Sequence, residues 1–127
     1  MTDHVTLRIP ATTGHVGLAR ATATALAARI DFTYDRLTDL HIAIDEVCGR
    51  VLATSDPAAR HLEITFSPEP DGLWISVRGD GQLKPGGHLL NPWSKVILDS
   101  IARDLEITEA EGGEVAASFR VHRGEGG

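Results

Sequence analysis

The sequence contains a single cysteine and no long apolar run. Cys48 cannot form a disulfide within this chain, and its apolar neighbours in a helical pattern predict a buried, unreactive thiol. No segment approaches the roughly 18 apolar residues that a membrane-spanning helix needs. Residues 1–10 also lack the basic start and apolar core of a signal peptide. We therefore expect a cytoplasmic protein.

Basic residues are scarce as well. Lysine and arginine number 12 against 18 aspartates and glutamates, which gives a net charge of −6. Binding to nucleic acid needs clustered positive charge, and no basic stripe is present, so direct DNA or RNA binding is disfavoured. The six histidines show no metal-ligand spacing, and no metal site is expected. An acidic chain of this size fits a protein partner or a small ligand better.

Apolar periodicity predicts strands and helices in separate runs. Alternation predicts strands at residues 5–9, 61–67, 73–78, 105–108 and 114–121. Helical periods predict a helix that Thr12 or Thr13 caps and that runs to Ile30, a second at 35–53, and a third from Pro92. The residues between 79 and 92 are rich in glycine and proline and predict a mobile loop. We expect one domain, residues 1–127, with an α+β two-layer sandwich of about five mostly antiparallel strands under three helices.

Glu46 and Arg50 stand four residues apart in the predicted helix 35–53, and the same side of the helix carries Asp39. One interpretation makes Glu46 a general base beside an anion-binding arginine. A second is an ordinary surface ion pair, worth about 0.3–0.5 kcal/mol. In a third, Arg50 fills a former pocket and neutralises Glu46. The two residues by themselves leave all three interpretations open.

Two further features have alternative interpretations. Asp80 and Gly81 would either contact a purine or form a plain turn, since both residue types favour turns. Trp93 follows the glycine-rich loop and would either pack on the core or stay exposed as an anchor for a partner. No serine–histidine–carboxylate set and no Walker-type phosphate loop stands out, so the residues give no support for nucleophilic catalysis.

The order of these elements, together with the helix "HIAIDEVCGRVLA", the turn in "VRGDGQL" and the glycine-rich loop, resembles a known family. It is similar to the histidine-kinase-type ATPases (the GHKL superfamily) in their smallest form, the RsbW-like anti-sigma factors. The similarity runs from "LRIPA" at 7–11 to "SFRV" at 118–121, and "DEVC-x-R" is especially like mycobacterial-type SigF antagonists. The resemblance implies a Bergerat-type ATPase fold in a serine kinase that holds a sigma factor inactive and phosphorylates a STAS-domain antagonist.

The first sequence box of this family is Glu-x-x-x-Asn, in which the glutamate is the base and the asparagine holds Mg²⁺. Glu46 matches the glutamate, which makes it the candidate general base. The asparagine position is Arg50. A guanidinium has only N–H donors and no acceptor oxygen, and Mg²⁺ requires oxygen ligands. The resemblance therefore implies that magnesium binding is disfavoured.

The second box is Asp-x-Gly-x-Gly, in which the aspartate accepts from the adenine amino group. Gly79 occupies the aspartate position, Gly81 keeps the first glycine, and Leu83 replaces the second. Asp80 stands one residue late, and one step along a strand turns a side chain to the other face. Only a bulge would bring Asp80 back to the adenine position.

The third box is a Gly-x-Gly turn before the third helix, where backbone N–H groups hold phosphates. Pro92 and Ser94 align with it, and Pro92 has no N–H to donate. Gly86 and Gly87 would substitute for the missing glycines from a different position in the loop.

The leading prediction is an anti-sigma factor that binds and sequesters a sigma factor and is released by a STAS-domain partner. Two alternatives are an active ATP-dependent serine kinase and an interaction module without a sigma partner. ATP is the candidate cofactor, and family members often dimerise, so a homodimer is a further candidate. The candidate cofactor-binding residues are Arg50, Gly79, Asp80, Gly81, Gly86 and Gly87.

Overall fold

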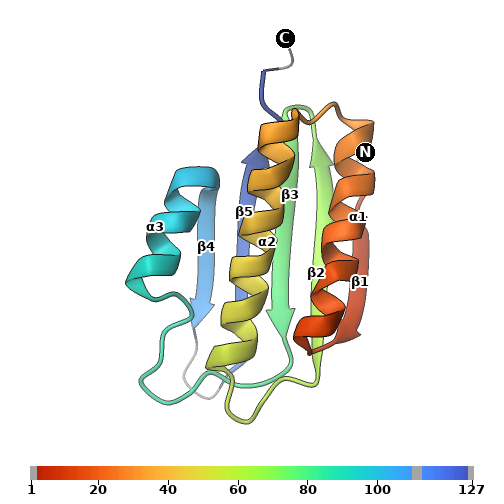
Figure 1. Ribbon diagram of the computed structural model, residues 1–127. Helices are drawn as coiled ribbons and strands as arrows, with labels where there is room; N and C mark the ends of the chain where they lie inside the picture. Colours follow the sequence, from red (N-terminus) through yellow and green to blue (C-terminus); the bar gives the residue numbers. More distant parts are fainter. Residues whose placement is uncertain (1–2, 110–112, 126–127) are drawn as a thin grey trace.

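The computed structural model describes residues 3–109 and 113–125, which form five strands and three α-helices (Figure 1). Their order is β1 (Val5–Pro10), α1 (Val16–Arg29), α2 (Tyr34–Thr54), β2 (His61–Glu69), β3 (Gly72–Gly79), α3 (Pro92–Ile101), β4 (Arg103–Glu109) and β5 (Val115–His122). The predicted order of strands and helices is confirmed, and their ends differ by a few residues. None of the helices in these ranges is long and apolar enough to cross a membrane.

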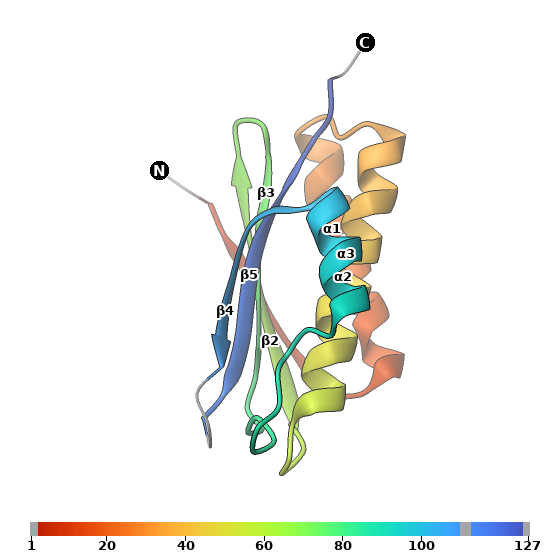
Figure 2. The same ribbon diagram turned by 90° about the vertical axis from the view of Figure 1, so that its left-hand side faces the viewer.

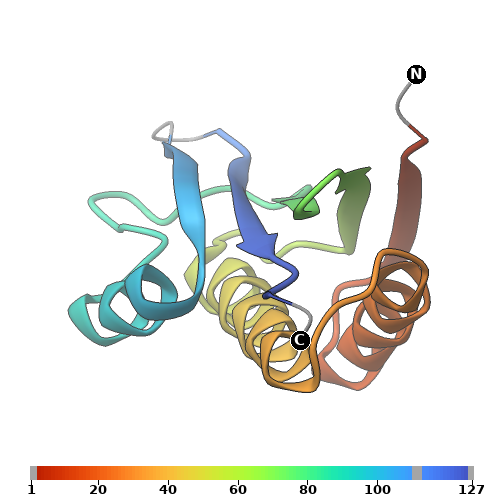
Figure 3. The same ribbon diagram turned by 90° about the horizontal axis from the view of Figure 1, so that it is seen from above.

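All five strands join one antiparallel sheet in the order β1-β2-β3-β5-β4. The helices lie together on one face of this sheet, and α2 lies between α1 and α3 (Figures 2 and 3). Within the described ranges no helix covers the opposite face. The predicted α+β two-layer sandwich is therefore confirmed.

The hydrophobic core lies between α2 and the central strands. In β2, β3 and β5 every second side chain faces the helices, because successive side chains of a strand point to opposite faces. The α2 residues that face the sheet are all 0% exposed: Leu40, Ala43, Ile44, Val47, Cys48 and Val51. Burial of one large apolar side chain stabilises the fold by about 1.5–3 kcal/mol. This packing fixes the rotation of α2 about its axis and turns Glu46 and Arg50 toward α3.

The helix starts differ in how well the sequence predicted them. The prediction that Thr12 or Thr13 caps the first helix is wrong, because a 3-10 turn at Thr13–His15 precedes α1 and the Thr12 hydroxyl lies 2.7 Å from His15 Nδ1. The start of α3 at Pro92 is confirmed. Asn91 caps this helix by accepting a backbone hydrogen bond in its first turn, at 2.7 Å.

Candidate functional site

Glu46 and Arg50 meet the start of α3 and the loop that leads to it. The Ser94 hydroxyl donates to Glu46 Oε2 at 3.1 Å, and Ser94 is only 1% exposed. Arg50 Nε donates to the carbonyl oxygen of Leu89 at 2.7 Å, and Leu89 is fully buried. No ion pair within 4.0 Å joins the Glu46 carboxylate to the Arg50 guanidinium. The interpretation of these two residues as a surface ion pair is therefore wrong.

Asp39, which the helical period places on the same side of α2, has a different partner from Glu46 and Arg50. Its carboxylate pairs with Arg36 Nη1 at 2.8 Å. Arg36 also donates to the carbonyl oxygens of Ile101 and His122, at 3.1 and 2.9 Å. Asp39 thus orients an arginine that ties α2 to the ends of α3 and β5. The helical period predicts the side of a helix but not which element packs against each of its turns, so this partner was not predicted.

The loop before α3 is fastened to its surroundings at several points. The backbone N–H of Leu89 donates to the Glu109 carboxylate of β4, and His88 Nδ1 lies 3.3 Å from the same carboxylate. Nearer to β3, the N–H of Leu83 donates to Gly113 and the N–H of Lys84 to Thr54, at 3.1 and 3.0 Å. Along its path from β3 to α3 (Figure 1), the loop is therefore attached by hydrogen bonds to α2, to β4 and to Gly113.

Gly79 and Gly81, which align with the aspartate and the first glycine of the second box, lie very close to other protein atoms. A Cβ on Gly79 would lie 2.7 Å from a methyl carbon of Val51, and a Cβ on Gly81 would lie 2.5 Å from the backbone nitrogen of Ala59. Leu83, which replaces the second glycine of the box, is 4% exposed and belongs to the core. A side chain at position 79 would thus collide with Val51 of α2.

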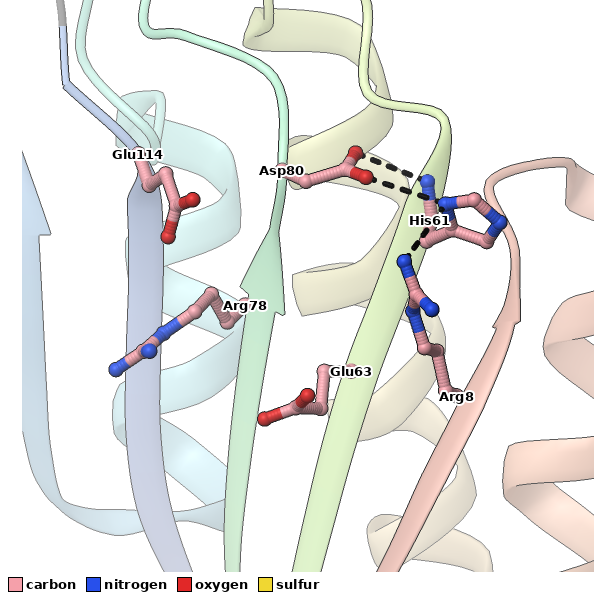
Figure 4. Close-up of a pocket in the computed structure, with 6 residues that line it drawn as sticks. All are labelled: Arg8, His61, Glu63, Arg78, Asp80 and Glu114. Atoms are coloured by element: carbon pink, nitrogen blue, oxygen red, sulfur yellow. Dashed lines mark hydrogen bonds and ion pairs between the residues drawn. The ribbon is translucent and has the colours of Figure 1, made fainter.

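Asp80 lies on the face of the sheet that the helices leave uncovered (Figure 4). Its Oδ1 accepts from the backbone N–H groups of Arg60 and His61 at 2.6 and 2.9 Å, and its Oδ2 lies 3.2 Å from His61 Nδ1. The backbone hydrogen bond from His61 is the largest cause that lowers the pKa of Asp80, to about 2. The side chain also lines a cavity of about 300 Å³ with Arg8, His61, Glu63, Arg78 and Glu114. Asp80 therefore fastens the start of β2 on the face opposite to Glu46.

Gly86 and Gly87 form an exposed turn in the loop. The N–H of Gly87 donates to the Lys84 carbonyl at 2.9 Å. Gly86 has a φ of 71°, which favours glycine. The candidate site residues are thus dispersed: Glu46 and Arg50 lie together under α3, Gly79 and Gly81 pack against neighbouring backbone or side chains, and Asp80 lies on the other face.

Neither Glu46 nor Arg50 lines any of five cavities that lie among residues 3–109 and 113–125. In the same ranges, no group of three or more histidine, cysteine, aspartate or glutamate side chains is placed to hold a metal ion. The donor-only guanidinium of Arg50 does not fit a magnesium ion, and we derive no chemical step through one.

Sequence reasoning missed the partners of this site, Ser94 and Leu89. A partial signal exists in the sequence: Asn91 before Pro92 predicts a capped helix start, which places Ser94 in the first turn. The contact of Ser94 with Glu46 spans 48 residues of the chain and depends on how α3 docks. Trp93 is 71% exposed, so it does not pack on the core, and its role as an anchor for a partner stays a prediction.

Comparison with known proteins places this geometry in a family. The family model of the histidine kinase-like ATPase domain matches residues 9–95. The chain belongs to this family. The match runs from the end of β1 through β3 to the start of α3, and it includes Glu46 and Arg50. The family match therefore covers the whole of α2, the helix that carries Glu46 and Arg50.

The most similar relatives that we compared are serine-protein kinases named RsbW. The chain is 32% identical to RsbW of Bacillus velezensis and 31% identical to RsbW of Bacillus subtilis, over 81 residues in each case. These alignments cover 62% of this chain and 51% of each relative, so the chain spans about half the length of the relatives it matches. The predicted resemblance to RsbW-like proteins is confirmed.

A solved structure shares the fold. The RsbU and RsbW domains of a Mycobacterium tuberculosis protein superpose with a TM-score of 0.70 over 94% of this chain and 32% of that one. The sequence identity is 16%, so this likeness supports the arrangement of the sheet and helices alone. It agrees with the two-layer architecture of this ATPase-type domain.

Proposed function

We propose that this protein is an anti-sigma factor that acts by binding: it sequesters a sigma factor and is released by a STAS-domain partner. Membership of the histidine kinase-like ATPase family and similarity to RsbW support this assignment. The net charge of −6 supports a partner with basic surfaces, because complementary charge speeds encounter and disfavours wrong partners.

One observation carries the preference for binding over catalysis. Arg50 stands where the family's first box has an oxygen ligand for the metal, and its Nε is bound to the Leu89 carbonyl at 2.7 Å. A guanidinium cannot replace an oxygen ligand, and this one holds the chain's own backbone. The remaining groups of the site have internal partners too, since Ser94 donates to Glu46 and Asn91 caps the first turn of α3.

The second candidate function is an ATP-dependent serine kinase, and one contact favours it. Glu46 accepts a hydrogen bond from a serine hydroxyl, the same type of contact that a general base makes with a substrate serine. ATP would supply the phosphoryl group in such an enzyme. In this protein the hydroxyl belongs to Ser94 of the same chain, so that contact occupies the carboxylate.

The decisive experiment is affinity capture of the tagged protein in the cells that encode it, followed by identification of the bound proteins. Recovery of a sigma factor or a STAS-domain protein is expected, and recovery of neither contradicts the proposal. Calorimetry with ATP and Mg²⁺ separates the two candidate functions. Binding heats at micromolar ATP that vanish in Glu46→Ala would favour the kinase. For a protein that acts only by binding its partners, no binding heat is expected up to millimolar ATP.

A further inference from the structure

We propose that Arg50 is a latch that keeps the segment 85–90 closed against α2 in the absence of any bound ligand. This inference rests on the proposed function, because it explains how the site between α2 and α3 stays shut without a nucleotide. Arg50 acts here as a positioning residue, through the main chain of Leu89.

Leu89 is held from two sides. Its carbonyl oxygen accepts from Arg50 Nε of α2 at 2.7 Å, and its backbone N–H donates to the Glu109 carboxylate of β4. Its side chain is 0% exposed and belongs to the hydrophobic core. Both backbone groups of one buried residue thus bind charged side chains from different layers of the fold, and hydrogen bonds to charged groups are the stronger kind.

The neighbouring residues have weaker support. Lys84, Pro85, Gly86 and His88 are exposed, and Gly86 and Gly87 form the turn that precedes Leu89. A short glycine-containing turn costs little to open. The segment is therefore held at Leu89, and Arg50 attaches this residue to α2.

The beginning of the loop has separate anchors. The backbone N–H groups of Leu83 and Lys84 donate to Gly113 and Thr54, and neither contact involves Arg50. Loss of the latch should therefore free residues 85–90 and leave residues 83 and 84 in place. This difference supplies an internal reference within a single loop.

The test compares Arg50→Met with Arg50→Gln by hydrogen exchange of single amides, followed by NMR on the isolated protein. Both variants lose the charge. The glutamine side chain carries an N–H₂ group the same number of bonds from the backbone as arginine Nε, so it can still donate to the Leu89 carbonyl. Methionine has a similar length and no donor.

In Arg50→Met we expect the Leu89 amide to exchange about ten-fold faster than in the wild type, while the Leu83 and Lys84 amides change by less than about two-fold. In Arg50→Gln the Leu89 amide should return to within about three-fold of the wild type. Arg20→Ala is the matched control, because it removes an arginine that pairs with α2 at exposed Asp45 and should leave all three amides unchanged.

Equal exchange of Leu89 in the methionine and glutamine variants would overturn the proposal. So would loss of the folded circular-dichroism spectrum in Arg50→Met, because a latch acts locally. The experiment contains no partner and no nucleotide, so its outcome is independent of the capture experiment. If neither a sigma factor nor a STAS-domain protein is captured and the exchange pattern is as expected, the proposed function fails and the latch stands.

Discussion

The buried hydroxyl of Ser94 donates a hydrogen bond to the carboxylate of Glu46 across 3.1 Å, and it joins α3 to α2. The same interface contains the contact of Arg50 with Leu89. Together these contacts give internal partners to Glu46 and Arg50, the two residues of α2 that align with the first sequence box. In this protein the same residues bind α3 and its loop to the rest of the fold.

Ser94→Ala should lower the free energy of unfolding by about 1–2 kcal/mol, because it removes the hydrogen bond from a buried hydroxyl to the Glu46 carboxylate. Urea denaturation followed by circular dichroism measures this change. Ser100→Ala is the matched control on the same helix, since the exposed Ser100 hydroxyl bonds only to the Ile97 carbonyl. The control variant should lower the free energy of unfolding by less than about 0.5 kcal/mol. Equal losses in both variants would show that the contact with Glu46 adds no stability.

Arg50→Asn restores the residue type of the family's first box, yet we expect it to bind ATP and Mg²⁺ no better than the wild type. The reason is that Val51 fills the space beside Gly79 and that Asn91 already caps the first turn of α3. Isothermal calorimetry with millimolar nucleotide is the measurement. Micromolar binding by this variant would contradict the argument, because it would mean that Arg50 alone blocks an otherwise intact site.

The sequence predicted the parts of this site that depend on local periodicity. The helical pattern of residues 35–53 correctly placed Glu46 and Arg50 on one side of a helix, away from the core stripe. The pattern contained no information about what covers that side. Leu89 and Ser94 follow 39 and 48 residues later, and only the docking of α3 brings them to these side chains.

Asp80 shows the opposite case, in which a local rule was sufficient. Leu73, Ile75 and Val77 alternate as the apolar face of this strand, so the same alternation assigns Asp80 to the uncovered face. The structure places it there, beside His61 (Figure 4). Its partners, the N–H groups of Arg60 and His61, depend on the register between β2 and β3, which the hairpin sequence does not specify.

The thiol of Cys48 should resist modification in the folded protein. Cys48 is 0% exposed, and burial is the main cause that raises its pKa to about 12, so almost no thiolate is present at pH 8. A colorimetric disulfide reagent should therefore react only when the protein unfolds, at a rate that follows urea concentration. Rapid reaction in buffer would show that α2 opens readily from the sheet.

Asp80→Asn should weaken the protein at neutral pH and have less effect in acid. The pKa of Asp80 is about 2 in the folded protein, below the ordinary value of 3.8, because the carboxylate accepts backbone hydrogen bonds from His61 and Arg60. A lowered pKa stabilises the fold above the unfolded value, and this contribution is lost as the pH falls from about 4 to about 2. Urea denaturation of both proteins at several pH values between 7 and 2.5 should show a difference that shrinks across that window. A difference that stays constant with pH would mean that the asparagine disrupts packing and that the charge of Asp80 is immaterial.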